Sequence, residues 1–147
     1  MAQIKKILCT VDFSEYSPQI ADYALTLTNA LQSELHVLYV TPILAQDMDF
    51  TVSPSYLEEL NKDVTTEAQK SMQEFIAENM NQVQANGHVM QGHAAETILD
   101  FASQKAIDLI VMGTHGRKGL NRVLFGSVAD RVVKSANIPV LTLRPQT

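Results

Sequence analysis

The sequence is poor in the residues that cross-link or interrupt a chain. It has one cysteine, Cys9, which excludes an internal disulfide and a site built from several thiolates, and which suits a reducing cytoplasm. Six glycines and five prolines are too few for a collagen-like or low-complexity sequence. No unbroken apolar stretch reaches the roughly 18 residues of a membrane-spanning helix. The sequence therefore predicts no membrane insertion.

Positive charge is also scarce. Lys plus Arg number 11 against 16 Asp plus Glu, so the formal net charge is -5. This balance argues against the basic face that nonspecific nucleic-acid binding needs. Residues 1–6 lead into a strand-like segment without the apolar run and small-residue cleavage site of a secretory signal. We therefore expect a cytoplasmic protein that does not bind nucleic acid.

The residues that are present provide one folded core. Hydrophobic residues make up 46% of the chain and charged residues 18%, which excludes a disordered chain. A length of 147 residues fits one domain, residues 1–147, better than two.

Short apolar runs alternate with segments of helical periodicity. The runs predict strands over 4–11, 35–40, 88–91, 107–112 and 140–144, and the periodic segments predict helices over 18–31, 57–76, 96–104 and 128–136. Ser17 is expected to cap the first helix, and Asn86-Gly87 to break the chain before the third strand. The strands are apolar nearly throughout, which is typical of strands covered on both faces. The order β-α-β-α-β-α-β-α-β therefore predicts a parallel sheet between layers of helices.

Two connections are candidates for function. Residues 41–54 hold two prolines and no clear period, so we expect a long loop that is the most mobile segment of the chain. In open parallel sheets, ligands bind beyond the carboxyl ends of strands, where the strand order reverses. The residues after the first, second and fourth strands are therefore the candidates for a site.

The segment from Gly113 to Gly126 follows the fourth strand and has the spacing G-x2-G-x9-G-S. Free N–H groups at Gly126, Ser127 and Val128, where the last helix opens, would form an anion site. Three basic side chains lie in the same stretch: Arg117, Lys118 and Arg122. Together these features suggest a site for a ligand with phosphate groups. The same composition also suits a loop that only turns the chain, and the residues alone leave both interpretations open.

The common phosphate-binding motifs do not occur here. There is no G-x-x-x-x-G-K-[ST], and the glycines are not spaced as G-x-G-x-x-G. The segment, together with residues 7–14 and 92–98, instead resembles the nucleotide-binding branch of the universal stress proteins. Three landmarks in the right order carry this resemblance over essentially the whole chain. Thr10 and Ala94 stand where many members of the family have proline.

The resemblance implies a three-layer α/β/α fold with a five-stranded parallel sheet of order 3-2-1-4-5, like that of the adenine nucleotide alpha hydrolases. It also implies a stress-response homodimer formed through the last strand, with ATP and Mg²⁺ or Mn²⁺ in the cleft between the first and fourth strands. Asp12 would hold the ribose and contact the metal, and the backbone of Val40 would meet the adenine. The ligand-binding residues implied in this way are Thr10, Val11, Asp12, Val40, Met112, Gly113, Gly116, Arg117, Gly126, Ser127 and Val128.

Several side chains have a plainer alternative. Asp12, at a strand end, either caps the amides of Ser14 and Glu15 or binds a ligand. His115 could contact phosphate, but an exposed loop histidine is the simpler interpretation. The other histidines lack the spacing of metal ligands, so we expect ordinary surface or strand-end residues and no protein-only metal site: His36, His88 and His93. Cys9 is expected to be a small buried hydrophobe.

We expect binding more than catalysis, because no motif places a nucleophile beside a general base near the glycine-rich segment. If slow hydrolysis or autophosphorylation occurs, Asp12 and Ser127 are the candidates. An enzyme that cleaves ATP or transfers a nucleotidyl group is the first alternative, although neither H-x-G-H nor S-G-G-x-D-S occurs. A nucleotide-free, protein-binding dimer is the second, and the intact G-x2-G-x9-G-S argues against it. A protein or transporter partner fits either kind of dimer. In both, the two copies would pair through the apolar strand 140–144 at the edge of the sheet.

Overall fold

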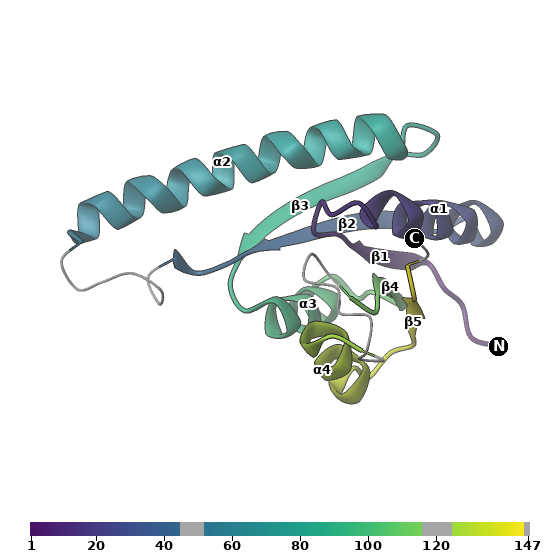
Figure 1. Ribbon diagram of the computed structural model, residues 1–147. Coiled ribbons are helices and arrows are strands. Elements are labelled where there is room, and N and C mark those ends of the chain that lie inside the picture. The colour runs from purple at the N-terminus through teal and green to yellow at the C-terminus, as the bar shows by residue number, and fades with distance from the viewer. Residues whose placement is uncertain (45–51, 116–124, 146–147) are drawn as a thin grey trace.

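The computed structural model describes residues 1–44, 52–115 and 125–145 (Figure 1). Within these residues the chain forms five strands and four helices. They are β1 (Lys6–Thr10), α1 (Ser17–Leu31), β2 (Glu34–Thr41), α2 (Pro54–Asn79), β3 (Ala85–Gln91), α3 (Ala94–Gln104), β4 (Leu109–Gly113), α4 (Ser127–Ser135) and β5 (Val140–Leu143). All strand pairs are parallel and the sheet order is β3-β2-β1-β4-β5, which confirms the predicted fold class and strand order.

The helices cover both faces of the sheet. In Figure 1, α1 and α2 lie on one side of the strands and α3 and α4 on the other. β1, at the centre, shows how the sequence produces these layers. Ile7 and Cys9 pack into the core beneath α1 and α2, and Leu8 packs into the core beneath α3 and α4, with no solvent exposure at any of the three. A strand buried on both faces needs apolar side chains at consecutive positions, as the sequence has at residues 7–9.

Cys9 is buried as predicted, and burial raises the pKa of its thiol to about 12. A thiol of that pKa stays protonated at neutral pH, so it packs as an apolar group. None of the helices in the described part of the chain is long and apolar enough to cross a membrane.

Ser17 does not cap α1, so that prediction was wrong. The N-cap residue is Tyr16, and Ser17 is the first helical residue. Its side chain is fully buried, and Oγ donates to Oδ1 of Asp12 at 3.0 Å. The hydroxyl therefore stabilises the turn after β1 instead of the free N–H groups of the helix.

The third strand is longer than predicted, because Asn86-Gly87 lies inside it. Gly87 pairs with Val37 of β2. A Cβ at Gly87 would come within 2.7 Å of Met72 Cγ and 2.8 Å of Ile76 Cδ1. Glycine is needed here because α2 crosses the strand closely, not because the chain turns.

The other boundaries move by a few residues. α2 begins at Pro54 because Ser53 caps it, accepting from Tyr56 N at 3.3 Å, and because proline suits the first turn. The predicted loop 41–54 is therefore the connection between β2 and α2, and its residues 45–51 lie outside the described residues, so its expected mobility stays a prediction.

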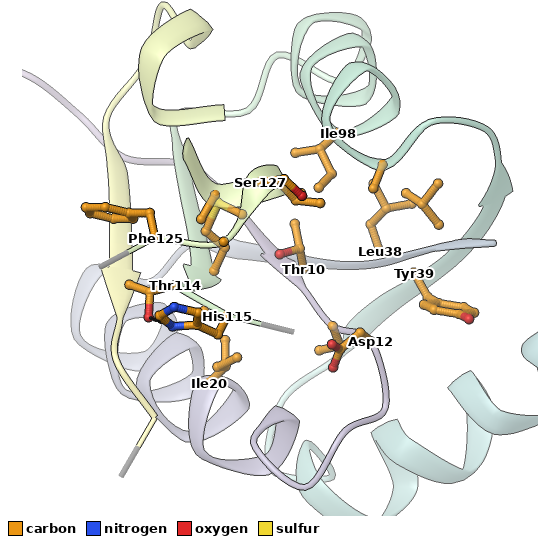
Figure 2. Close-up of a pocket in the computed structure, with 18 residues that line it drawn as sticks. Thr10, Asp12, Ile20, Leu38, Tyr39, Ile98, Thr114, His115, Phe125 and Ser127 are labelled. Atoms are coloured by element: carbon orange, nitrogen blue, oxygen red, sulfur yellow. Dashed lines mark hydrogen bonds between the residues drawn. The ribbon is translucent and has the colours of Figure 1, made fainter. Parts of the chain in front are cut away.

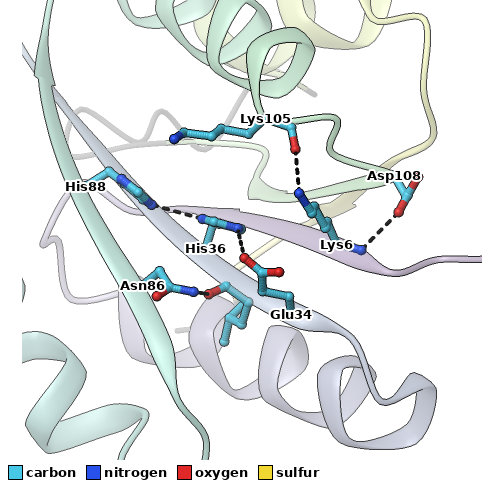
Figure 3. A network of polar contacts seen from close by, with 8 residues as sticks. Lys6, Glu34, His36, Asn86, His88, Lys105 and Asp108 are labelled. Carbon is cyan, nitrogen blue, oxygen red and sulfur yellow. Dashed lines mark hydrogen bonds and ion pairs between the residues drawn. The ribbon is translucent and has the colours of Figure 1, made fainter.

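His36 and His88 are not the ordinary surface or strand-end residues that we expected. His36 lies in the middle of β2 with 6% of its surface exposed, and its Nδ1 is 2.9 Å from Nε2 of His88 on β3 (Figure 3). Oε1 of Glu34 lies 2.7 Å from the other nitrogen of His36. The His88 ring also packs edge-on against Phe101 of α3. The histidines thus join two strands and a helix, a partnership that their sequence spacing does not reveal.

Candidate functional site

A cavity of about 490 Å³ lies beyond the carboxyl ends of β1 and β4. These neighbouring strands lead to helices on opposite faces, because β1 continues into α1 and β4 continues towards α4. This is the point of a doubly wound sheet at which ligands bind. The volume is also that of an ordinary small-molecule site.

The wall of the cavity is mostly apolar, with a few polar groups. The apolar side chains come from β2, β4, helices on both faces and the residues next to β1 and α4: Val11, Ile20, Leu38, Val40, Ala94, Ile98, Met112, Phe125, Val128 and Ala129. The polar side chains are Thr10, Asp12, Tyr39, Thr114, His115 and Ser127. In Figure 2, Thr10 lies between Ser127 and Asp12, so polar groups follow the line from α4 to the end of β1. Such a cavity can take a ligand with one flat apolar part and one polar or charged part.

Asp12 is held in a defined orientation. Its Oδ1 accepts from Ser14 N at 3.0 Å and from Ser17 Oγ at 3.0 Å. The backbone N–H of Asp12 in turn points to Ser17 Oγ at 3.4 Å. The capping prediction is confirmed for Ser14, whereas the structure supplies a serine hydroxyl where we expected the amide of Glu15. Since Asp12 also lines the cavity, capping and ligand binding are compatible here.

The N-terminus of α4 opens onto the cavity. Its N-cap residue, Gly126, has an extended backbone, and no described side chain caps the helix there. Contrary to our prediction, the N–H of Gly126 is not free, because it donates to Thr114 O at 2.7 Å. Ser127 and Val128, in the first turn, line the cavity. The first N–H groups of a helix lack partners within the helix and carry its positive dipole end. This end of the cavity therefore favours an anion.

Gly113 and Gly126 are both crowded by the protein itself. A Cβ at Gly113 would lie 2.8 Å from Ile20 Cδ1, and one at Gly126 would lie 3.2 Å from the carbonyl oxygen of Thr114. The glycines let β4, α1 and α4 approach one another at the edge of the cavity. A larger residue at either position would disturb the protein as well as a ligand, so glycine substitutions alone cannot test binding.

His115 is half-buried beside the cavity, so the prediction of an exposed loop histidine was wrong. Its Nδ1 lies 3.0 Å from Oγ1 of Thr114, which is buried. Within the described residues, its Nε2 is buried without a hydrogen-bond partner. The sequence signal was available, since His115 lies only two residues after the end of β4.

The structure brings together nine of the eleven residues that the resemblance implied. They are Thr10, Val11, Asp12, Val40, Met112, Gly113, Gly126, Ser127 and Val128. Gly116 and Arg117 lie outside the described residues. Sequence analysis missed the contributions of α1, α3 and the middle of β2, namely Ile20, Leu38, Tyr39, Ala94 and Ile98. Only the position of Tyr39, beside Val40 at a strand end, offered a signal.

A metal ion would find little protein support here. In the described portion of the chain, no three His, Cys, Asp or Glu side chains come together as a metal site. Asp12 is the one carboxylate among the described residues that line the cavity. Mg²⁺ can bind through one carboxylate when phosphate groups and water complete its coordination. The residues therefore fit a metal that arrives with a phosphorylated ligand.

Solved and curated proteins share this architecture. The chain is 36% identical over 141 residues to universal stress protein MJ0531 of Methanocaldococcus jannaschii, covering 95% of this chain and 82% of that protein. The solved structure of MJ0577 from the same organism superposes with a TM-score of 0.84 at 27% identity, over 99% of both chains. A universal stress protein from Archaeoglobus fulgidus, solved in complex with dAMP, has the same fold, with a TM-score of 0.58 at 19% identity over 97% of this chain and 98% of that one. Residues 3–144 match the universal stress protein family as a whole, and the chain belongs to that family.

Proposed function

We propose that this protein binds ATP in the cavity between β1 and β4 and acts as a nucleotide-dependent regulator of a stress response in the cytoplasm. The observation that carries the proposal is the open N-terminus of α4, at one side of an apolar cavity that also contains the Asp12 carboxylate. A nucleotide has an apolar base, a ribose with hydroxyls and an anionic phosphate chain, which matches these three features. The dAMP complex of the Archaeoglobus fulgidus relative supports an adenine nucleotide as the ligand.

The proposed roles follow from the position of each residue. The N–H groups of Ser127 and Val128 bind phosphate oxygens, and Asp12 accepts from the ribose hydroxyls. Gly126 lies beside the phosphates, while its own N–H stays on Thr114 O. The backbone of Val40 meets the adenine between the apolar side chains of the wall. Thr10, Val11, Met112 and Gly113 form the surface beneath the ribose and phosphates. Gly116 and Arg117 complete the phosphate site in this proposal.

Mg²⁺ or Mn²⁺ would accompany the phosphates and neutralise part of their charge. Asp12 is the side chain placed to contact it, and the nucleotide and water would supply the remaining ligands. Because the protein contributes so little to the metal, we expect the ion to bind with ATP and not before it.

The function also includes a homodimer formed through β5. This strand is one edge of the sheet, and its residues are only half-buried. The carbonyls of Pro139 and Leu143 accept from β4, so those of the alternate residues Val140 and Thr142 face the open edge. An edge of this kind pairs readily with a second copy.

The binding proposal is tested by calorimetric titration of nucleotide-stripped protein with ATP, with and without Mg²⁺. We expect one saturable site per chain. Asp12→Asn keeps an oxygen that can accept from Ser14 and Ser17 but removes the charge, and we expect affinity to fall about tenfold. The matched control is Asp22→Asn on the exposed face of α1, which should bind as the wild type does. No heat of binding, together with no nucleotide released from unstripped protein on denaturation, would rule out the proposal.

The dimer has its own test in analytical ultracentrifugation. Thr142→Pro removes an outward-facing N–H without touching the ladder to β4, so it should raise the dissociation constant of the dimer at least tenfold. Thr142→Val keeps the N–H and should dimerise normally. A wild-type chain that sediments as a monomer at micromolar concentration would contradict the dimer and leave ATP binding untouched.

A further inference from the structure

Phe13 has a backbone conformation that bulky residues rarely adopt. Its φ of 59° lies in the left-handed region, where the Cβ of an L-residue crowds the neighbouring carbonyl oxygen. Phe13 directly follows Asp12, which lines the cavity. Glycine would make the same turn without strain. The phenylalanine side chain must therefore contribute something that offsets the strained backbone.

The Phe13 ring lies between a cavity residue and α2. Its centroid is 4.6 Å from that of Tyr39, with the ring planes tilted by 50°, and 5.8 Å from that of Phe75 in an edge-on arrangement. Tyr39 lines the cavity, and Phe75 is a buried residue of α2. Both geometries are favourable for aromatic pairs. The ring thus connects the wall of the cavity to a long helix on the sheet.

The orientation of Asp12 depends on the same turn. Oδ1 of Asp12 accepts from Ser14 and Ser17, which both lie beyond Phe13 in the chain. The backbone at Phe13 therefore sets where these donors meet the carboxylate. Figure 2 shows Asp12 and Tyr39 at the same end of the cavity, away from Phe125.

We propose that Phe13 is a positioning residue: its ring, packed between Tyr39 and Phe75, holds the left-handed turn that aims the Asp12 carboxylate at the ribose of the bound nucleotide. This inference rests on the proposed function, in which Asp12 accepts from the ribose hydroxyls. It adds that ribose recognition is coupled to the packing of α2, although Phe75 does not line the cavity.

The test compares the affinities for ATP and for 2′,3′-dideoxy-ATP, which lacks the hydroxyls that Asp12 would bind. We expect wild-type protein to prefer ATP about tenfold, since hydrogen bonds to a charged group are worth that factor or more. Phe13→Leu keeps apolar bulk but loses the ring contacts, and it should reduce the preference to about threefold or less. Its affinity for the dideoxy nucleotide should change by less than about twofold, because that ligand does not use Asp12. A general loss of stability would lower the affinity for both nucleotides by the same factor. The ratio of the two affinities therefore distinguishes a positioning role of Phe13 from a role in folding.

Three further variants complete the experiment. Phe75→Leu should also lower the preference for ATP, as Phe13→Leu does, although Phe75 lies outside the cavity. Phe13→Gly removes the ring but makes the left-handed turn without strain, so it should keep more of the preference than Phe13→Leu does. Ala106→Gly relaxes another left-handed residue, with φ of 53°, at the opposite end of β4, and should leave the preference unchanged.

The outcomes separate the two proposals. Wild-type protein that binds no ATP overturns the proposed function. Wild-type protein that binds ATP and the dideoxy nucleotide equally well overturns the role of Asp12, and with it this inference. If Phe13→Leu still prefers ATP over the dideoxy nucleotide tenfold, the role of Phe13 alone is overturned. If Phe13→Leu does not fold, the same result in Phe75→Leu overturns it.

Discussion

Glycines and histidines have different surroundings in two regions of the molecule. One region is the outer half of the sheet, β2 with β3, and the other is the cavity at the ends of β1 and β4. At Gly87, the space left by the missing side chain is taken by Met72 and Ile76 of α2. At Gly126, the two nearest atoms are backbone atoms of Thr114 and His115, and the helix that follows starts without a side-chain cap from the described residues. His36 and His88 of the outer half pair with each other, and Glu34 lies against the other nitrogen of His36, whereas the buried Nε2 of His115 at the cavity has neither a hydrogen bond nor an ion pair among the described residues. Groups that are matched within the protein contribute stability, and we expect the groups left open to contribute affinity for a ligand.

The variant with the largest expected effect is Gly87→Val in the outer half of the sheet. Its Cβ would approach Met72 Cγ to 2.7 Å, and the added methyl groups would force α2 away from β3. We expect the free energy of unfolding to fall by about 2–3 kcal/mol, as for other overpacked sites. Urea unfolding measures the change, while the ATP affinity of the folded variant should equal that of the wild type.

The control for Gly87→Val is Met90→Val on the same strand. It also introduces a β-branched residue, but in place of a longer side chain, so it adds no Cβ against α2. Its urea midpoint should lie close to that of the wild type. Equal destabilisation by the two variants would mean that the close approach of α2 is not what requires glycine.

At the cavity, Ser127→Ala should have the opposite profile. The variant loses a hydroxyl beside the proposed phosphate site but keeps every backbone N–H, so ATP affinity should fall about fivefold, or ~1 kcal/mol. Alanine suits a helix better than serine, so the ligand-free protein should be no less stable. Titration calorimetry and urea unfolding measure the two quantities. Ser135→Ala, at the exposed other end of α4, is the matched control and should bind ATP normally.

The same contrast explains what the sequence could predict of the fold. β1 was predictable because burial on both faces produces a continuous apolar run, which is a local signal. The start of β3 was not, since Asn86-Gly87 is a turn signal unless the passage of Met72 and Ile76 over the strand is known. Those contacts join residues that are separate in the sequence and meet only after folding.

The residues of the candidate site also differ in whether the local sequence indicates them. Asp12 and the Gly126–Val128 segment could be found because a strand end and a helix start carry local patterns. Leu38 and Ile98 could not, because their place at the cavity depends on how β2 and α3 meet β1. The aromatic contacts of Phe13 were equally inaccessible, since nothing in the local sequence indicates that Phe75 of α2 lies beside it.

The smallest expected effect is the pH dependence of the outer half of the sheet. Burial lowers the pKa of His88, and repulsion from His36 and then Lys105 lowers it further. The surrounding groups are His36 and Glu34 on β2, and Phe101 and Lys105 at α3. Between the lowered pKa and the ordinary value of about 6.5, the unfolded chain binds more protons than the folded chain. Stability from this residue is therefore full above pH ~6.5 and declines as the pH falls towards the folded pKa.

We expect a fall of a few degrees in melting temperature on acidification through this window, measured between about pH 8 and pH 5. His88→Gln should make the curve shallower, because glutamine does not titrate, whereas His93→Gln at an exposed position should leave the slope as it is. If His88→Gln and the wild type lose stability in parallel, the histidine pair is not the source of the pH dependence. ATP affinity should be the same in both histidine variants at neutral pH, because a pair matched within the protein acts on folding and not on the ligand.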